Sequence, residues 1–123
     1  MSRDRLYLLD ILEAIERIKK YTQDAEEWRQ DELVQTWVIH HIQIIGEASR
    51  ALSPEMKARY PHILWRDIVR MRNILVHQYF DVDVATVQSV VDSQLPILRH
   101  DIQGILRAEF GESVPLMSDK DAE

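Results

Sequence analysis

The sequence predicts an all-α protein that folds as an antiparallel four-helix bundle with one additional short helix. Three observations lead to this fold class. Glycine and proline number only 3 and 4 among 123 residues, which favours long helices over turn-rich β structure. Apolar residues recur at helical spacing in four separate segments. The connections between these segments are short, as they are between antiparallel neighbours in a bundle.

Two long helices are expected in the first part of the chain, at residues 4–22 and from Asp31 to about Leu52. Asp31 is a favourable N-cap for the second helix. The polar residues 23–30 form a connection or a short helical turn. The two apolar stripes consist of Leu8, Ile11, Leu12, Ile15 and Ile18, and of Val34, Trp37, Val38, Ile42, Ile45, Ala48 and Leu52.

Ser53 and Pro54 predict the start of a short helix, because serine caps helix N-termini and proline suits the first helical position. This helix is expected to end near residues 60–61. A longer helix follows at about residues 64–79. Its core-facing residues are expected to be Leu64, Ile68, Met71 and Leu75.

The last helix is expected from about Val84 to Phe110, after an N-cap at Asp81 or Asp83. Pro96 lies inside its apolar stripe of Val84, Val87, Val91, Leu95, Leu98, Ile102 and Ile105. The stripe resumes after the proline, so Pro96 should kink the helix and not end it. Gly111 is a suitable residue for the C-terminal stop.

The length and composition fit one domain with a core of its own. The hydrophobic fraction is 46%. Residues 1–111 are expected to form the bundle, and the acidic residues 112–123 to be disordered. The absence of cysteine excludes a disulfide framework and suits the cytoplasm. No signal-like segment and no run of eighteen apolar residues is present, so no association with a membrane is expected.

Positive charge is concentrated in the middle of an acidic chain. The formal net charge is −6. Residues 49–77, however, carry six Lys or Arg against two Asp or Glu, whereas both flanks are net acidic. An anion can therefore bind near this basic stretch although the whole chain would repel a polyanion. Candidate contacts for a nucleic acid are Lys57, Arg59, Arg66 and Arg70.

The segment Arg-Asn-Ile-Leu-Val-His-Gln-Tyr at residues 72–79 carries the reactive side chains. Helical geometry places Arg66, Arg70, Asn73 and His77 on one polar stripe. An isolated Arg or His at such a position usually belongs to a solvated basic face. Here the clustering of charge within acidic flanks, and asparagine, a poor helix former, at position 73, favour a functional site.

Arg72-Asn73-x3-His77-x-Tyr79 resembles the active-site motif of the HEPN-domain proteins, and of the HepT toxins in particular. The resemblance covers about residues 4–110. Its context also matches, with Gly46-Glu47 late in the second long helix, then Pro54, Tyr60-Pro61, Trp65 and Ile68 in the order typical of this family. This chain departs nowhere from the motif.

The resemblance implies a metal-independent ribonuclease that works as a dimer of four-helix bundles, with no cofactor. Arg72 and His77 would be catalytic, and Asn73 accessory. The partner of such toxins is a minimal nucleotidyltransferase antitoxin of the MntA type, which silences the toxin by transferring AMP to the motif tyrosine, here Tyr79. The substrate would be a cellular RNA such as tRNA or mRNA.

The chemistry of these residues is compatible with that activity. Metal-free RNA cleavage can use the 2′-hydroxyl of the substrate as nucleophile. Histidine can move the protons near neutral pH, and a guanidinium group matches the oxygens of the phosphate. No His-Glu-x-x-His motif and no Gly-rich phosphate loop occurs in the sequence, so neither metal nor nucleotide-loop chemistry is expected.

The helical wheel raises a difficulty for a site within one chain. Arg72 and His77 point about 140° apart on a straight helix. Either Arg72 reaches around on its long side chain, or His77 works with the Arg72 of another protomer. We favour the second arrangement as a hypothesis, and it predicts a homodimer, or a higher oligomer, with a composite site.

Three further positions leave alternatives open. Glu47 forms either a surface pair with Arg50 or a pair that orients Arg72. His41 lies on the apolar stripe and is expected to be a core histidine. Trp65, beside the basic stripe, is the tryptophan that could stack on a base, although core packing is the more usual role. For the chain as a whole, the alternative is a non-catalytic HEPN subunit that serves as scaffold or modification substrate of a nucleotidyltransferase.

Overall fold

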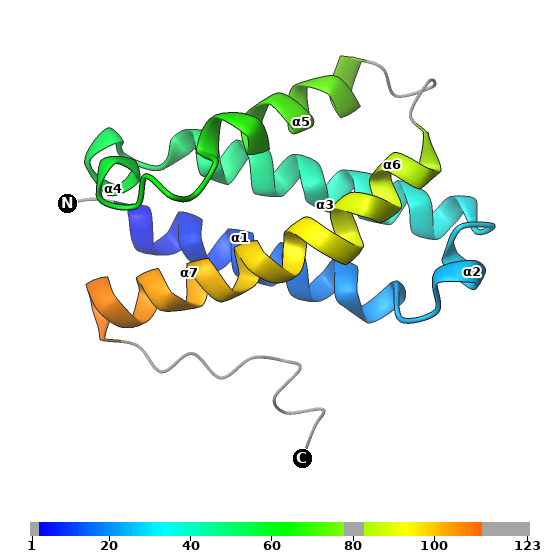
Figure 1. Ribbon diagram of the computed structural model, residues 1–123, viewed down its shortest axis with the longest axis horizontal. Helices are drawn as coiled ribbons and strands as arrows, with labels where there is room; N and C mark the ends of the chain where they lie inside the picture. The colour runs from blue at the N-terminus through cyan, green and yellow to red at the C-terminus, as the bar shows by residue number, and fades with distance from the viewer. Residues whose placement is uncertain (1–2, 78–82, 112–123) are drawn as a thin grey trace.

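The computed structural model describes residues 3–77 and 83–111, and for residues 76 and 77 it describes the backbone alone. The described residues form an all-α bundle of the predicted class (Figure 1). Its long members are α1 (Asp4–Tyr21), α3 (Glu32–Ala51), α5 (Trp65–His77) and a final segment of α6 (Val84–Ser89), η2 (Val90–Gln94) and α7 (Leu95–Phe110). The short helices are α2 (Ala25–Trp28) and α4 (Pro54–Arg59).

Local sequence signals determine where the helices begin. The carboxylate of Asp31 accepts hydrogen bonds from the backbone N–H groups of Leu33 and Val34, at 3.0 and 3.3 Å. The Ser53 hydroxyl accepts from the N–H of Met56, and Pro54 fills the first position of α4. Asp83, and not Asp81, is the N-cap of α6. These bonds satisfy N–H groups that have no partner within the helix itself.

Pro96 does not end the last helical segment, and a wider turn precedes it. The turn before it, η2, is a π-helix in which the N–H of Leu95 donates to the carbonyl of Val90, five residues back. Proline has no N–H to donate and its ring would collide with the carbonyl of residue 92 in a regular α-helix. The wider π turn relieves this collision. The helix then continues to Gly111, which ends it with a positive φ of 64°.

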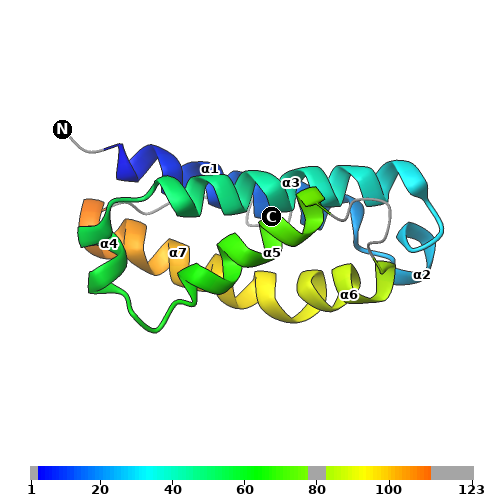
Figure 2. The ribbon, with the colours of Figure 1, turned by 90° about the horizontal axis from the view of Figure 1, so that it is seen from above.

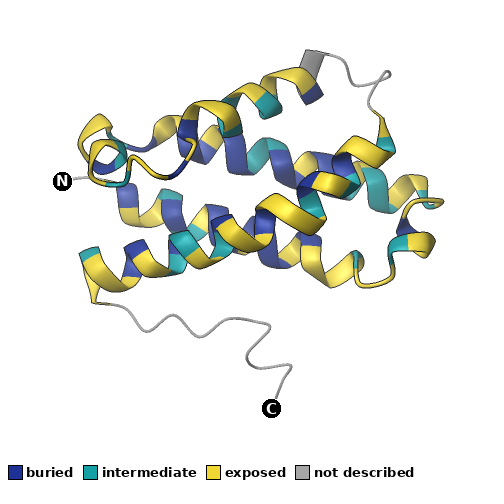
Figure 3. Cartoon of the chain, viewed as in Figure 1, coloured by how far each residue is buried: buried dark blue, intermediate teal, exposed yellow. Residues whose placement is uncertain are grey.

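The hydrophobic core lies along α1 and α3, the two central helices. Figure 2 shows α5 packed along α3, while α7 lies along α1. Buried faces turn inward on every long helix (Figure 3). The completely buried large side chains include Leu8, Ile11, Ile42, Ile45, Ile102 and Ile105. None of the described helices combines the length and the apolar character that crossing a bilayer would require.

Two buried carboxylates connect elements that are distant in sequence. Asp4, at the start of α1, accepts hydrogen bonds from the backbone N–H and the hydroxyl of Ser53, at 2.8 and 2.6 Å. The same serine therefore caps α4 and attaches it to α1. Glu16 of α1 pairs with Arg99 of α7. A buried charge is costly unless it is paired, so both contacts favour one arrangement of the helices.

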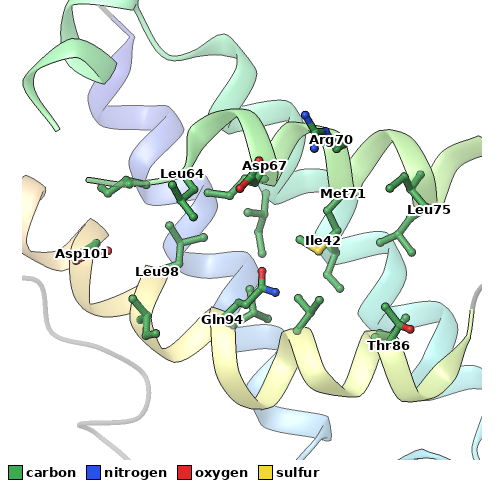
Figure 4. A pocket seen from close by; sticks show the side chains of 18 of the residues that line it. Ile42, Leu64, Asp67, Arg70, Met71, Leu75, Thr86, Gln94, Leu98 and Asp101 are labelled. Carbon is green, nitrogen blue, oxygen red and sulfur yellow. The ribbon is translucent and has the colours of Figure 1, made fainter. Parts of the chain in front are cut away.

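The core-facing prediction for α5 is only partly correct, because this helix packs on one side alone. Leu75 is buried, but Leu64 is 65% exposed. An open apolar groove of about 620 Å³ separates α5 from α6, η2 and α7 (Figure 4). Met71 and Ile68 lie in its wall instead of a closed core. The edges of the groove also carry exposed Ile74 and Ile97.

His41 is the core histidine that the apolar stripe predicts. It is only 2% exposed, and its Nδ1 lies 2.7 Å from the carbonyl oxygen of Trp37. Burial holds the pKa of His41 below its ordinary value of 6.5, against the opposite effect of the hydrogen bond to Trp37. The neighbouring His40 lowers the pKa further. His41 is therefore neutral in the folded protein at neutral pH.

The lowered pKa of His41 predicts a loss of stability in mild acid. The unfolded chain takes up a proton on His41 near pH 6.5, whereas the folded protein resists it. The contribution of neutral His41 to the free energy of unfolding is therefore complete above pH 6.5. It is lost as the pH falls below 6.5 and through the lower pKa that His41 has in the folded protein. We expect the free energy of unfolding, measured with urea from about pH 7.5 to 5, to fall less steeply in His41→Gln than in the wild type. The exposed His100 supplies the control variant, His100→Gln. Equal slopes for wild type and His41→Gln would contradict the assignment.

Candidate active site

The candidate site begins where α3 and α5 approach most closely. The two helices run antiparallel (Figure 1), and Gly46 of α3 lies directly against Arg72 of α5. A Cβ atom at position 46 would lie 2.2 Å from the Cβ of Arg72. Glycine costs about 1 kcal/mol relative to alanine inside a helix. Its presence here is explained by the space that Arg72 needs.

The guanidinium group of Arg72 is held by two neighbours. One terminal nitrogen donates to Oε1 of Glu47 and the other to Oδ1 of Asn73, each at 3.0 Å. The Nε atom is buried without a hydrogen-bond partner among the described residues. Each terminal nitrogen of a guanidinium carries a further N–H, and the side chain is 23% exposed. The group is therefore fixed in direction and still able to bind an anion.

Glu47 pairs with Arg72, which decides between the two alternatives for this residue. The carboxylate is 61% exposed, so the pair contributes on the order of 0–1 kcal/mol to stability. Such a contact is weak as a source of stability. It is effective as a means of orientation, because Glu47 and Asn73 hold the guanidinium from two helices.

Asn73 connects Arg72 to the polar stripe of α5. Asn73 is exposed and precedes His77 by four residues, so the two lie on one face of the helix. The bond to Asn73 shows that Arg72 bends toward this face within its own chain. The predicted catalytic residue His77 is the last residue of α5, and its side chain is not described. The predicted modification site, Tyr79, lies outside the described residues.

The predicted RNA-binding cations fall into two groups. Arg66 and Arg70 are exposed on α5, on the face of Asn73. Lys57 and Arg59 lie on α4 and are engaged elsewhere. Lys57 donates to the carbonyls of Ser49 and Arg50 at the end of α3. The first group shares α5 with Arg72, whereas Lys57 is engaged with α3 and Arg59 with α7.

Arg59 belongs to a separate polar cluster between α4 and α7. It pairs with Glu109 at 2.8 Å, and the hydroxyl of Tyr60 donates to the same carboxylate at 2.7 Å. Hydrogen bonds from Tyr60 and Arg59 hold the pKa of Glu109 below its ordinary range. This cluster attaches α4 to the end of the bundle, so its arginine acts as a structural contact.

Trp65 packs in the core, the more usual role expected for it, and is not exposed for stacking on a base. Its side chain is 8% exposed, and its indole N–H donates to the carbonyl of Tyr60 at 3.2 Å. Trp65 packs as the first residue of α5.

Within the described ranges, no three His, Cys, Asp or Glu residues gather as a metal site would need.

The family of the chain follows from comparison with known proteins. The model of the family described as "Ribonuclease HepT-like" matches residues 11–105. The chain belongs to the HepT-like family. The resemblance seen in the Arg72–Tyr79 motif and its context is thereby confirmed, and the all-α bundle agrees with it.

Two curated relatives of this HepT-like chain come from archaea. It is 41% identical to the "Probable ribonuclease HepT" of Thermococcus cleftensis, over 76% of this chain and 86% of the relative. It is 39% identical to the "Gamma-glutamylcyclotransferase and putative RNase MJ0434" of Methanocaldococcus jannaschii, over 86% of this chain. That match spans only 49% of the relative, so the chain covers about half of that protein. No solved structure gives a significant match.

The close approach of α3 and α5 predicts opposite effects for alanine at two helical glycines. At Gly46 the new methyl group would collide with the side chain of Arg72, so Gly46→Ala should destabilise the protein by about 1–3 kcal/mol. At Gly104 in α7, a Cβ atom would have no neighbour within 4 Å, so Gly104→Ala should stabilise by about 0.5–1 kcal/mol. Urea unfolding of both variants measures the difference. A neutral Gly46→Ala would show that Arg72 does not need this space.

Proposed function

We propose that this HepT-like chain is a metal-independent endoribonuclease, the toxin of a toxin–antitoxin pair, which cleaves tRNA or mRNA in the cytoplasm. The observation that carries the proposal is the Arg72 guanidinium. Glu47 and Asn73 hold it at 3.0 Å each, and it keeps N–H groups for an anion. The membership in the HepT-like family supports the same activity.

The reaction follows from the chemistry of the motif residues. His77 accepts the proton of the 2′-hydroxyl, whose oxygen attacks the adjacent phosphorus. The bond from phosphorus to the 5′ oxygen breaks, and that oxygen takes up a proton. The products are a 2′,3′-cyclic phosphate and a 5′-hydroxyl. Arg72 donates hydrogen bonds to the phosphate oxygens, where negative charge increases in the transition state.

The accessory residues orient the guanidinium group of Arg72 and help to bind the RNA. Glu47 and Asn73 hold the guanidinium in place, so little reorganisation is needed when the phosphate binds. Arg66 extends the positive charge along α5 and would contact a neighbouring phosphate, and Arg70 would do so only where no partner covers the groove that it also lines. Within the described part of the chain, neither of these two arginines forms a salt bridge that would compete with RNA.

Tyr79 would be the regulatory residue of the toxin. An MntA-like nucleotidyltransferase antitoxin would transfer AMP to its hydroxyl group. Tyr79 follows His77 by two residues, so the adduct would enter the region of the site. Its phosphate would neutralise nearby arginines and its bulk would exclude RNA.

The apolar groove supports a homodimer, with a second copy of this chain as its occupant. Exposed Leu64, Ile74 and Ile97 line its edges. The groove also carries both signs of charge, since Asp67 and Arg70 of α5 and Asp101 of α7 lie along it. Under two-fold symmetry the same surface meets itself, so an arginine of one copy can face an aspartate of the other.

Because Arg72 already bends toward the His77 face of its own helix, we propose one catalytic pair within each chain of the dimer, in place of a composite pair.

The cleavage experiment tests the enzymatic proposal. Purified protein is incubated with total RNA and EDTA, beside folded Arg72→Ala and His77→Ala variants. We expect the wild type to cleave, and each variant to lose at least about a hundredfold in rate, because one loses the positive charge and the other the proton acceptor. Products with 2′,3′-cyclic phosphate ends, identified by mass spectrometry, would support the mechanism.

A control is needed because a modified protein would look inactive. The mass of the Tyr79-containing peptide is therefore measured in the same sample. No cleavage by a folded protein with unmodified Tyr79 would favour the alternative, a non-catalytic subunit that serves as scaffold or modification substrate of the nucleotidyltransferase.

The dimer is tested separately at the edge of the groove. Ile97→Glu places a charge on the apolar surface of α7 without touching α5, and it should convert a dimer to a folded monomer in light scattering. Leu33→Glu is the matched control, because Leu33 is 82% exposed and lies outside the groove. We expect the Ile97→Glu monomer to keep its rate of cleavage per chain. A folded monomer that loses cleavage would instead establish the composite site, and an Ile97→Glu dimer would exclude the groove as the interface.

A further inference from the structure

His40 lies on the outer face of α3, on the side of the Arg72 site. It precedes Glu47 by seven residues, so both lie on one line of the helix, separated by roughly 10 Å. His40 is exposed. Glu47 bonds to Arg72, so this line continues the candidate site toward the N-terminus of α3.

The register of the two antiparallel helices places His40 at the level at which α5 ends. Gly46 lies opposite Arg72. Each step toward the start of α3 therefore corresponds to one step toward the end of α5. Ile42 and Leu75, which are within one residue of this register, both line the groove. His40 lies six steps from Gly46, and six steps from Arg72 lead one residue past His77, so the level of His40 is that at which α5 ends.

The ring of His40 rests on a rigid aromatic cluster. Its plane is perpendicular to the ring of His41, with centroids 5.2 Å apart. His41 in turn packs on Trp37 at 4.3 Å, and the indole N–H of Trp37 donates to the carbonyl of Arg17 in α1 at 3.0 Å. Tyr21 closes the row, edge to face with Trp37. Side chains connected in this way lose little entropy when a ligand binds to the outermost ring.

We propose that His40 is a base-stacking subsite for the nucleotide next to the scissile phosphate. The inference rests on the proposed ribonuclease function. Single-stranded RNA is recognised largely by stacking of bases on aromatic side chains, histidine among them. With a phosphate at Arg72, the base of an adjacent nucleotide lies within reach of a ring at the level of His77. Trp65, the tryptophan considered for base stacking, is buried and cannot serve in this role.

The test measures binding first, so that it does not depend on cleavage. The probe is a short single-stranded 2′-O-methyl RNA, which has no free 2′-hydroxyl to act as nucleophile. Its binding is measured by fluorescence anisotropy. We expect His40→Ala to weaken binding about tenfold, and His40→Phe to bind within about twofold of the wild type, because it keeps a stacking face. The control variant His100→Ala removes an exposed histidine from α7 and should bind as the wild type does.

A second arm locates the contact on the RNA. A series of RNA probes carries one abasic nucleotide, placed at a different position in each probe. At one position the missing base should weaken binding to the wild type and leave binding to His40→Ala unchanged. With cleavable RNA, His40→Ala should raise KM and leave kcat nearly unchanged. A loss of kcat that His40→Phe does not restore would indicate proton transfer and overturn the stacking role, as would unchanged binding by His40→Ala. If the wild-type protein binds the probe through His40 but cleaves no RNA, the proposed nuclease activity is rejected and the binding subsite is retained.

Discussion

The site depends on one close contact, the approach of α3 and α5 at Gly46. With any larger residue at this position, the side chain of Arg72 could not lie against the backbone of α3. The consequence is that the stem of the arginine is enclosed, and only its terminal nitrogens reach Glu47 and Asn73. A flexible cation is thus turned into a fixed donor. The helix-interior glycine lowers local stability for this purpose, as functional positions often do.

The same contact explains why α5 can leave an open groove. Since α5 is held along α3, it does not need to close against α6 and α7 to remain in place. Its second apolar face then stays free, with Leu64 and Ile74 at the surface. An exposed apolar groove of this kind can receive a partner. Arg72 does not line the groove, so a partner in the groove would leave the guanidinium group open, although it would cover Arg70.

Local signals in the sequence made most of the fold predictable. The contacts between helices could not be predicted from such signals. Asp31, Ser53 and Gly111 act on their own neighbours in sequence, so the ends of helices could be read directly. The pairing of Glu47 with Arg72 joins residues 25 positions apart and depends on the register of two helices, which periodicity does not determine. The exposure of Leu64 was missed for the same reason, because an apolar stripe indicates a face but not what covers it. The π turn before Pro96 could only be anticipated as a generic distortion.

His40 and His41 show how neighbouring residues of one type acquire different roles. They point about 100° apart on α3, so that one enters the core and the other remains in solvent. Burial makes His41 a neutral packing group by lowering its pKa. It is then suited to support His40, because its own ring is held in place by its contacts with Trp37. A lysine in place of His41 would add a charge but remove the rigid ring, and the row of aromatic contacts from Tyr21 to His40 would be interrupted. The aromatic row thus gives α3 a function at the site beyond that of Glu47, because it fixes a ring where the backbone of α5 ends.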